Sequence, residues 1–390
     1  MTQLRCPACD EARHVALVTT PPLPVHCNAY AQSREAARSA PRAVIELVQC
    51  RNCAHVFNRA FDEASLTYDA RYETSLHHSA VFVAWAEDLI ARLESRFRER
   101  RLDVIEIGCG RGEFLAMLAA RGHRCRGFDR SYDGRHAPSE RLRIEGRDYD
   151  PSIDDAADVD LVVSRHVLEH LADPIQLLRS MRSAMTGHAL GYLEVPNGNW
   201  TIRDGGIWDL IYEHAGYFVP TSLAALLDRA NLAPLAIEEE FGRQFLAATI
   251  VSTSSAKGHR STADRVAVAR ALSYGTRFSD TYRAELSRWS GVLEAEVAAG
   301  RKIALWGIGS KAVSFLNLLP HGSHIAYAID QNPAKLGCFV PGSGHRITDP
   351  VSLRGVSLDT VLIANPRYLD EIRSRLGELG HADVRVLPLS

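Results

Sequence analysis

The hydrophobic and polar positions of the chain predict short buried strands that alternate with helices. Apolar runs of strand length occur at residues 102–107, 124–128, 142–145, 159–163 and 189–195. An amphipathic helical pattern covers residues 78–100, and another helix is expected directly after the first of these runs. Strands that alternate with helices favour a parallel, doubly wound α/β sheet.

The same alternation begins a second time near the C-terminus. Residues 253–299 are polar and helix-like, and their sequence contains no glycine-rich phosphate loop. A strand is then predicted at 302–306, a helix at 312–319, and further strands at 325–329 and 360–364. This pattern predicts a second, smaller Rossmann-like α/β domain, joined to the first by a helical segment.

Composition and charge limit the classes of protein that fit this pattern. The chain has 390 residues, 46% of them hydrophobic, and its 45 Lys and Arg nearly balance its 47 Asp and Glu. That balance argues against a general nucleic-acid binder, which needs clustered basic residues. No apolar run approaches the roughly 20 residues of a membrane span, and the N-terminus lacks a signal-peptide pattern. We therefore expect a cytoplasmic protein of two or three domains.

Four of the eight cysteines form two C-x-x-C pairs near the N-terminus, namely Cys6, Cys9, Cys50 and Cys53. Two such pairs complete a tetrahedral site of four thiolates, the closed arrangement of structural zinc. His14 or His55 can substitute as a ligand. A redox role would need one pair on a thioredoxin-like strand–helix unit, and neither pair has that context. The remaining cysteines are interpreted as buried free thiols, and they are Cys27, Cys109, Cys125 and Cys338.

A glycine-rich turn follows the first predicted strand. Glu106 precedes this turn, in which Gly108, Gly110 and Gly112 alternate with other residues. Glycines permit a tight turn and let a ligand approach the backbone closely. Asp129 ends the next strand, 19 residues after Gly110, which suits an acid that binds ribose hydroxyls. A nucleotide cofactor such as NAD is the alternative, but the third glycine is one position early for the dinucleotide pattern.

This turn resembles the S-adenosylmethionine-binding motif of class I methyltransferases. The resemblance implies that the glycines line the methionine part of the cofactor and that Asp129 binds its ribose. It also implies an adenine contact from Asp148 with Tyr149, and it places Ser164 and His166 at the methyl side. The expected cofactor residues are therefore Glu106, Gly108, Gly110, Gly112, Asp129, Asp148, Tyr149, Ser164 and His166.

The run from His166 to His170 has a spacing that resembles a metal motif. Zincins place two histidines four residues apart with the acid directly after the first, whereas here Glu169 directly precedes the second. The base position is therefore wrong for a zincin. We interpret the run as a helix cap and core contact, since R-H-V-L-E-H is common in class I methyltransferases.

A second group of titratable residues follows the fifth strand and comprises Tyr212, Glu213, His214 and Tyr217. A histidine beside a carboxylate and between two tyrosines is a candidate general base, because histidine titrates near neutrality and such neighbours tune it. The alternative is an aromatic loop that packs over the cofactor, with Glu213 and His214 simply solvated.

The whole layout resembles the sugar C-methyltransferases of deoxysugar pathways, which methylate a ring carbon of a nucleotide-linked keto-sugar. That family has an N-terminal four-cysteine zinc module, a central class I methyltransferase domain and a C-terminal Rossmann-like domain. The resemblance rests on the four cysteines, the 106–112 turn, the 213–218 segment and the 306–312 turn. We expect a zinc-binding module at 1–65, an S-adenosylmethionine-binding domain at 66–252, a helical linker at 253–299 and a Rossmann-like domain at 300–390.

The usual family run, Y-H-E-H-x-x-Y-F, implies that His214 is the base and that the preceding glutamate is its acid partner. This chain has Ile211 and Tyr212 where tyrosine and histidine are usual, so Tyr212 can fill the tyrosine's role after a one-residue shift. The family also places a tyrosine from the segment after the zinc module near the sugar, a role open to Tyr72 or Tyr68.

The implied reaction needs a carbon acid. A ring carbon becomes nucleophilic when it is deprotonated next to a carbonyl, so we expect a keto-sugar substrate whose α-proton His214 removes. The resulting enediolate needs a hydrogen-bond donor, for which Tyr212, Tyr217 and Asn197 are candidates. No metal is needed for this step.

A second glycine turn begins the C-terminal domain. Gly307 and Gly309 precede Ser310 and Lys311 at the start of a predicted helix, and Asp330 ends the next strand. A glycine turn at a helix N-terminus suits anions, and the resemblance implies that Ser310 or Lys311 lies near a phosphate of the nucleotide-sugar. The alternative is a structural remnant that closes the cleft.

Other functions fit parts of the sequence. An O- or N-methyltransferase of another small molecule would keep the cofactor site but need no carbon acid. A non-catalytic interaction protein is disfavoured by the intact glycine turn, and nucleic-acid modification is disfavoured by the net charge of −2. We therefore expect a small nucleotide-sugar as the binding partner, and neither nucleic acid nor a membrane.

Overall fold

The computed structural model describes residues 4–67, 72–98, 100–253 and 264–389. Its largest sheet has the strand order β12-β13-β10-β9-β6-β7-β8. The strands are β6 (Asp103–Ile107), β7 (Arg124–Phe128), β8 (Leu142–Glu145), β9 (Leu161–Arg165), β10 (Leu190–Pro196), β12 (Leu232–Glu240) and β13 (Phe245–Ser252). Neighbours from β8 to β10 are parallel, and β13 is antiparallel to both β10 and β12.

Helices cover both faces of this sheet because successive side chains of a strand point to opposite sides. On β9, Leu161 and Val163 pack with one core and Val162 with another. The first core includes residues of α2 (Ala80–Ser95) and α3 (Glu113–Ala120). The second includes residues of α4 (Ile175–Ala184) and α6 (Pro220–Arg229). The short helix α5 (Gly198–Ile202) follows β10.

The N-terminal residues form a small sheet with the order β1-β4-β5-β11. Its strands are β1 (His14–Thr19), β4 (Glu46–Cys50), β5 (Val56–Asn58) and β11 (Gly216–Tyr217). A ribbon of β2 (Leu23–Pro24) and β3 (Arg42–Ala43), the helix α1 (Arg34–Arg38) and the 3-10 turn η1 (Glu63–Ser65) complete this region. Since β11 comes from the middle of the chain, the N-terminal sheet continues directly into the segment after β10.

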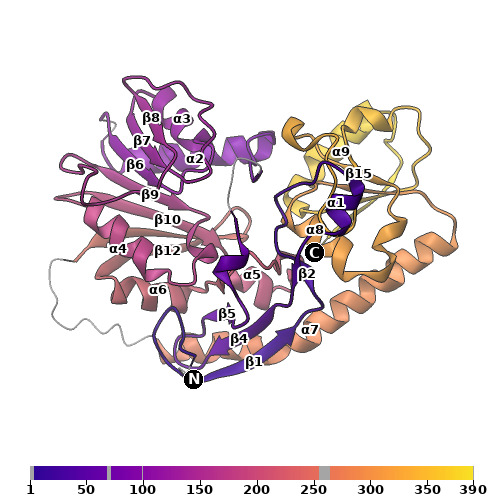
Figure 1. Cartoon of the computed structure of the whole chain (residues 1–390), viewed down its shortest axis with the longest axis horizontal. Helices are drawn as coiled ribbons and strands as arrows, with labels where there is room; N and C mark the ends of the chain where they lie inside the picture. Colours follow the sequence, from indigo (N-terminus) through magenta and orange to yellow (C-terminus); the bar gives the residue numbers. More distant parts are fainter. Residues whose placement is uncertain (1–3, 68–71, 99, 254–263, 390) are drawn as a thin grey trace.

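The long helix α7 (Arg265–Ala298) lies along the lower edge of the molecule and leads to the C-terminal domain (Figure 1). That domain has a parallel sheet in the order β16-β15-β14-β17-β18. The strands are β14 (Ile303–Trp306), β15 (Tyr327–Ile329), β16 (Ile347–Thr348), β17 (Thr360–Ile363) and β18 (Arg385–Pro388), with helices α8 (Ser310–Leu318) and α9 (Leu369–Glu378). Short 3-10 turns are η2 (Leu168–His170), η3 (Ile207–Asp209), η4 (Pro320–His324), η5 (Pro333–Lys335), η6 (Pro350–Leu353) and η7 (Pro366–Tyr368).

The doubly wound α/β fold with a second, smaller α/β domain is confirmed. The helix expected at 78–100 is shorter, Ala80–Ser95, and the strand expected at 159–163 begins two residues later, at Leu161. Asp160 explains this shift, because its carboxylate accepts hydrogen bonds from the Asp103 N–H (3.0 Å) and from Arg100 (2.5 Å) at the start of the strand. Within the described ranges, no helix is both long and apolar enough to cross a membrane.

Candidate functional site

The strand order of the large sheet reverses between β6 and β9. In doubly wound sheets, ligands bind in the crevice outside the carboxyl ends of the strands at this switch point. The first glycine turn follows β6, Asp129 follows β7, and Ser164 and His166 lie at the end of β9. The structure therefore brings these predicted cofactor residues to one edge of the sheet.

The glycines of the first turn are required by backbone conformation and by packing. Gly108 and Gly112 have φ angles of 77° and 79°, in the left-handed region that side chains disfavour. A Cβ at Gly108 would lie 2.2 Å from Val167 Cγ2, and one at Gly112 would lie 2.1 Å from Ile144 Cδ1. A Cβ at Gly110 would meet no described atom within 4 Å, so a ligand can approach this side of the turn.

The carboxylate of Asp129 is fixed beside the open side of this turn. Its Oδ2 accepts a hydrogen bond from the Gly110 N–H (2.7 Å), and its Oδ1 accepts from the N–H (2.7 Å) and hydroxyl (2.6 Å) of Ser131. The residue is only partly buried. This position suits a carboxylate that binds ribose hydroxyls, which stays a prediction.

Glu106 is the buried acid beneath the turn. Glu106 is only 3% exposed, and its Oε2 has no hydrogen-bond partner among the described residues. Burial raises the pKa of Glu106 to about 7, although the nearby Arg165 cation favours the charged form. An unpartnered buried oxygen next to open backbone fits a cofactor that brings its own donors.

A network of buried charges supports the methyl side of the predicted cofactor site. Glu194 Oε1 lies 3.0 Å from Arg165 Nε and 3.1 Å from His166 Nε2, and its Oε2 accepts a hydrogen bond from the Tyr192 hydroxyl (2.9 Å). Burial disfavours the Glu194 anion, but Arg165 and His166 outweigh it and lower the pKa to about 2. Burial likewise disfavours the His166 cation, but Glu169 and Glu194 raise its pKa to about 9. His166 is therefore a cation at neutral pH.

The other predicted cofactor residues have different surroundings. The fully buried Ser164 hydroxyl donates to the Ile107 carbonyl (2.8 Å), so it joins the ends of β9 and β6. Asp148 lies at the surface and pairs with Arg130 at 2.5 Å. Tyr149 is buried, and its ring meets Phe128 edge-on at 5.3 Å.

His214 lies in a buried position beside His170 and Tyr217. Its ring meets those of His170 and Tyr217 edge-on, with centroids 5.1 and 5.6 Å apart, and it is 8% exposed. Nδ1 has no hydrogen-bond partner among the described residues. Burial, followed by the charges of His170, His166 and Lys311, lowers the pKa of His214 well below its usual value. The imidazole is therefore neutral and has a nitrogen free to accept a proton.

The carboxylate of Glu213 points to the N-terminal region. It is fully buried, its Oε2 accepts a hydrogen bond from the Cys27 thiol, and its Oε1 lies 3.5 Å from His26 Nδ1. The Glu213 carbonyl accepts a hydrogen bond from His170 Nδ1 (3.0 Å), the ring that packs on His214. Among the described residues, no hydrogen bond joins the Glu213 carboxylate to the His214 ring. Glu213 is instead linked to that ring by its main-chain carbonyl, through the side chain of His170.

The candidate oxyanion donors are bound to the main chain. The Tyr212 hydroxyl accepts from the Asp62 N–H (3.0 Å) and donates to the Ala60 carbonyl (3.3 Å). The Tyr217 hydroxyl bonds both backbone groups of Ile211, at 3.2 and 3.3 Å. Asn197 caps α5 and donates to the Arg243 carbonyl (2.8 Å). A role in holding an enediolate would require these residues to exchange such bonds.

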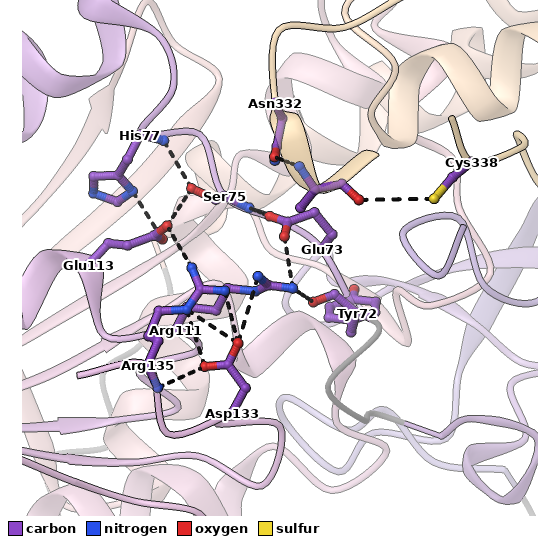
Figure 2. A network of polar contacts seen from close by, with 11 residues as sticks. Tyr72, Glu73, Ser75, His77, Arg111, Glu113, Asp133, Arg135, Asn332 and Cys338 are labelled. Carbon is purple, nitrogen blue, oxygen red and sulfur yellow. Dashed lines mark hydrogen bonds and ion pairs between the residues drawn. The ribbon is translucent and has the colours of Figure 1, made fainter. Parts of the chain in front are cut away.

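Tyr72 lies next to the cofactor turn, as Figure 2 shows. Its carbonyl accepts a hydrogen bond from Arg111 (3.4 Å), and Glu73 pairs with the same guanidinium at 2.8 Å. Ser75 donates to Glu113 (2.6 Å) at the start of α3. The segment 72–77 is therefore attached to the first glycine turn. Tyr68, the other candidate, lies outside the described residues.

Two groups of potential metal ligands occur among the described residues. In the first, Cys6 Sγ lies 3.7 Å from Cys53 Sγ, and Cys9 Sγ lies 3.5 Å from Cys50 Sγ. Zinc–sulfur bonds of about 2.3 Å in a tetrahedron separate the sulfurs by about 3.8 Å, whereas a disulfide brings them to about 2.05 Å. The four sulfurs therefore fit a zinc ion. The second group is Glu169, His170 and His214, with ligand atoms within 4.8 Å of one another.

The C-terminal domain contacts the segment that leads to His214. Lys311, in the first turn of α8, forms an ion pair with Asp209, and the Ser314 hydroxyl donates to the Leu210 carbonyl (2.8 Å). Ser310 is the first residue of α8. The expected phosphate-binding lysine thus lies near the base candidate, with its charge shared with a carboxylate.

Sequence reasoning missed several residues of this site. Cys27 was expected to be an incidental buried thiol, yet it contacts Glu213 across 186 residues of sequence. Arg165 and Glu194 were not singled out, although alternate charges within apolar strands are a usable signal for a buried network. For Cys27 no such local signal exists.

Comparisons with known proteins agree with this architecture. A model of a methyltransferase domain matches residues 77–237, and a model described as a C-methyltransferase C-terminal domain matches residues 258–388. No curated protein matches the chain.

Two solved structures with detectable similarity have low sequence identity to the chain. A magnesium protoporphyrin IX methyltransferase from Synechocystis PCC 6803 with bound SAH is 15% identical, with a TM-score of 0.35, over 46% of this chain and 89% of that one. A 1,6-didemethyltoxoflavin-N1-methyltransferase from Burkholderia thailandensis is 17% identical, with a TM-score of 0.35, over 51% of this chain and 96% of that one.

The matched domains and the strand order identify the class of enzyme. The chain is an S-adenosylmethionine-dependent methyltransferase with the class I, Rossmann-like fold. It also carries a C-methyltransferase C-terminal domain.

Proposed function

We propose that the chain transfers the methyl group of S-adenosylmethionine to a carbon of a nucleotide-linked keto-sugar, with His214 as the general base. The observation that supports this most is the state of His214, which is neutral and buried and has an unpartnered Nδ1. The C-methyltransferase model matched to residues 258–388 favours carbon as the acceptor atom.

The cofactor fits the edge of the large sheet. Bound S-adenosylmethionine supplies an electrophilic methyl group. Gly110 leaves room for a ligand beside the backbone, Asp129 holds a carboxylate at the rim, and Glu106 has an unpartnered oxygen. The cations of Arg165 and His166 both pair with Glu194, and His166 also lies near Glu169, so these contacts hold the end of β9 in place.

His214 then performs the proton transfer. Its neutral ring accepts the proton from the carbon next to the substrate carbonyl, and the C–H electron pair passes into the enediolate. The carbanion form attacks the methyl carbon, a carbon–carbon bond forms, and the electron pair of the carbon–sulfur bond leaves with sulfur. The proton stays on His214 until it is released to water. Tyr212, Tyr217 or Asn197 donates to the enediolate oxygen after exchanging a main-chain bond.

The two outer regions serve substrate binding and folding. Ser310 and Lys311 lie at the start of α8, where backbone N–H groups and a cation suit the phosphates of a nucleotide. A zinc ion bound by the four N-terminal thiolates would have no open coordination position, so its role is structural.

The decisive experiment separates carbon-acid chemistry from methyl transfer. We expect wild-type protein to exchange the α-proton of a nucleotide-linked 4-keto sugar into D2O, and to yield a C-methylated product by mass spectrometry. His214→Ala and His214→Asn should lose both activities by about 1,000-fold or more, while calorimetry shows unchanged S-adenosylmethionine binding. His188→Ala is the matched control, since His188 is exposed.

Two results would contradict the proposal. Near-wild-type exchange in His214→Ala would remove His214 as the base. Methyl transfer to oxygen or nitrogen without any proton exchange would replace carbon methylation by an O- or N-methyltransferase activity.

A further inference from the structure

We infer that Cys27 and His26 of the N-terminal region are positioning residues of the catalytic centre, which act on His214 through the Glu213 carboxylate. This inference rests on the proposed role of His214. It assigns a catalytic contribution to a region that would otherwise serve folding alone.

The two residues lie beside the two oxygens of one buried carboxylate. Glu213 is fully buried, and the Cys27 thiol donates a hydrogen bond to its Oε2. His26 Nδ1 lies 3.5 Å from its Oε1. His26 Nε2 accepts a hydrogen bond from the Thr67 N–H (3.2 Å), which fixes the ring beside Glu213. The two residues are adjacent in one segment.

The direction of the thiol hydrogen bond is fixed by electrostatics. Burial and the negative charge of Glu213 raise the pKa of the Cys27 thiol well above its usual value. The sulfur therefore keeps its proton and acts as the donor, while the carboxylate accepts. Asn28 Nδ2 lies 3.6 Å from the same sulfur and helps to fix it. Cys27 is thus suited to orient a carboxylate rather than to act as a nucleophile.

Two sets of contacts link the position of Glu213 to the position of His214. His170 Nδ1 donates to the Glu213 carbonyl, and the His170 ring packs on His214. In addition, β11 begins two residues after His214 and pairs with β5, and the Asn58 N–H donates to the Ala215 carbonyl (2.9 Å). The N-terminal region therefore holds the 213–217 segment through its backbone and through one carboxylate.

The same N-terminal segment also reaches the cofactor turn. The Asn28 carbonyl accepts a hydrogen bond from the Glu73 N–H (2.9 Å), and Ala29 forms a β-bridge with Tyr72. Tyr72 and Glu73 both contact Arg111 in the glycine turn, as Figure 2 shows. A continuous chain of contacts thus joins the cofactor edge to Glu213, so the segment 26–29 sets the base relative to the cofactor.

The test compares Cys27→Ala, which removes the donor, with Cys27→Ser, which replaces the thiol by a hydroxyl donor. We expect Cys27→Ala to lower kcat about 10- to 100-fold with little change in KM, since a hydrogen bond to a charged group is lost. Cys27→Ser should restore most of this loss. Cys125→Ala is the matched control, because Cys125 is equally buried but packs in the core of α2 and α3.

The split between kcat and KM distinguishes positioning from general loosening. A loosened N-terminal region should lower the free energy of unfolding and change KM together with kcat, whereas lost positioning should lower kcat alone and only in Cys27→Ala. Unchanged rates in Cys27→Ala, or equal losses in both variants, would overturn the inference. If the Cys27 pair behaves as expected while His214→Ala stays active, the proposed base is wrong instead.

Discussion

The two glycine turns of this chain have the same plan but different surroundings. Each follows the first strand of a parallel sheet, and each is followed by a strand that ends on an aspartate, Asp129 or Asp330. In each, the first glycine N–H donates to the carbonyl at the end of that next strand, Gly108 to Phe128 and Gly307 to Ile329, both at 2.8 Å. The backbone of the two turns therefore begins in the same way.

Both turns leave space beside a glycine, since a Cβ at Gly110 or at Gly309 would meet no described atom within 4 Å. They differ in the side chains that bind the turn and its aspartate. The Ile308 carbonyl accepts hydrogen bonds from the Tyr30 hydroxyl (2.7 Å) and from Lys335 Nζ (2.9 Å). Lys335 also pairs with Asp330 at 3.1 Å, and both residues are almost fully buried. The aspartate that would bind a ribose is therefore already neutralised. A glycine turn followed by an acid is thus not sufficient for a ribose-binding site, because the acid can already be paired with a buried cation.

The largest expected effect comes from removing the proposed zinc site, because Tyr30 belongs to the N-terminal region that a zinc ion at the four cysteines would stabilise. Structural zinc contributes on the order of 10 kcal/mol in small modules. We expect Cys53→Ser to lose the metal and to speed hydrogen exchange of the Gly307 amide about 100-fold or more, with little change at Gly108. Metal analysis and exchange mass spectrometry measure both.

The control for this prediction uses the second group of potential ligands. Glu169→Gln should keep one zinc per chain, since the four thiolates are intact. Loss of zinc from Glu169→Gln, with zinc retained in Cys53→Ser, would move the metal to the His214 group.

The next effect separates the two aspartates. We expect Asp129→Asn to weaken S-adenosylmethionine binding about 30- to 100-fold, because the variant would lose the charge-assisted hydrogen bonds that we propose between Asp129 and the ribose. Asp330→Asn should leave this affinity unchanged but destabilise the fold by about 3–5 kcal/mol, since Lys335 stays buried without its partner. Calorimetry and denaturant unfolding measure the two quantities. If both variants weakened S-adenosylmethionine binding equally, the proposal that only the first turn binds this cofactor would be wrong.

The sequence predicted what depends on local pattern. The apolar runs located β6, β7, β8 and β10, and the glycine spacing located the turn at 108–112. Prediction failed where the contact joins distant segments. The pairing of β5 with β11 has no local signature, and Lys311 meets Asp209 across 102 residues of sequence.

The candidate site divides in the same way. Asp129 and Gly110 could be paired from their spacing alone, and the hydrogen bond between them is present. Glu213 was expected to assist His214 directly, as its sequence neighbour. In the structure its carboxylate contacts Cys27 instead, because adjacent side chains in an irregular segment point in different directions. Only tertiary packing sets that direction.

A smaller effect concerns the acid beneath the first turn, for which the second turn has the apolar Leu305. Burial raises the pKa of Glu106 from 4.5 to about 7. A raised pKa means that the folded state binds the proton more tightly, so the stabilisation is full below pH 4.5 and is lost as pH rises through 7. We expect the cofactor-free wild type to lose about 3 kcal/mol relative to Glu106→Gln across this window. A constant difference between the two proteins from pH 4 to 8 would mean that Glu106 is not desolvated.

The smallest effect tests one of the side chains that bind the second turn. Tyr30→Phe removes one hydrogen bond to the Ile308 carbonyl, and Lys335 still donates to that oxygen. We therefore expect a loss of about 1 kcal/mol in unfolding free energy, with unchanged S-adenosylmethionine affinity. The matched control is Tyr282→Phe, because the buried Tyr282 hydroxyl has no partner among the described residues and its removal should be neutral or stabilising. If both substitutions lower the unfolding free energy by the same amount, the Tyr30 hydroxyl adds no stability beyond that of the ring. The stabilising hydrogen bond to the Ile308 carbonyl would then be that of Lys335 alone.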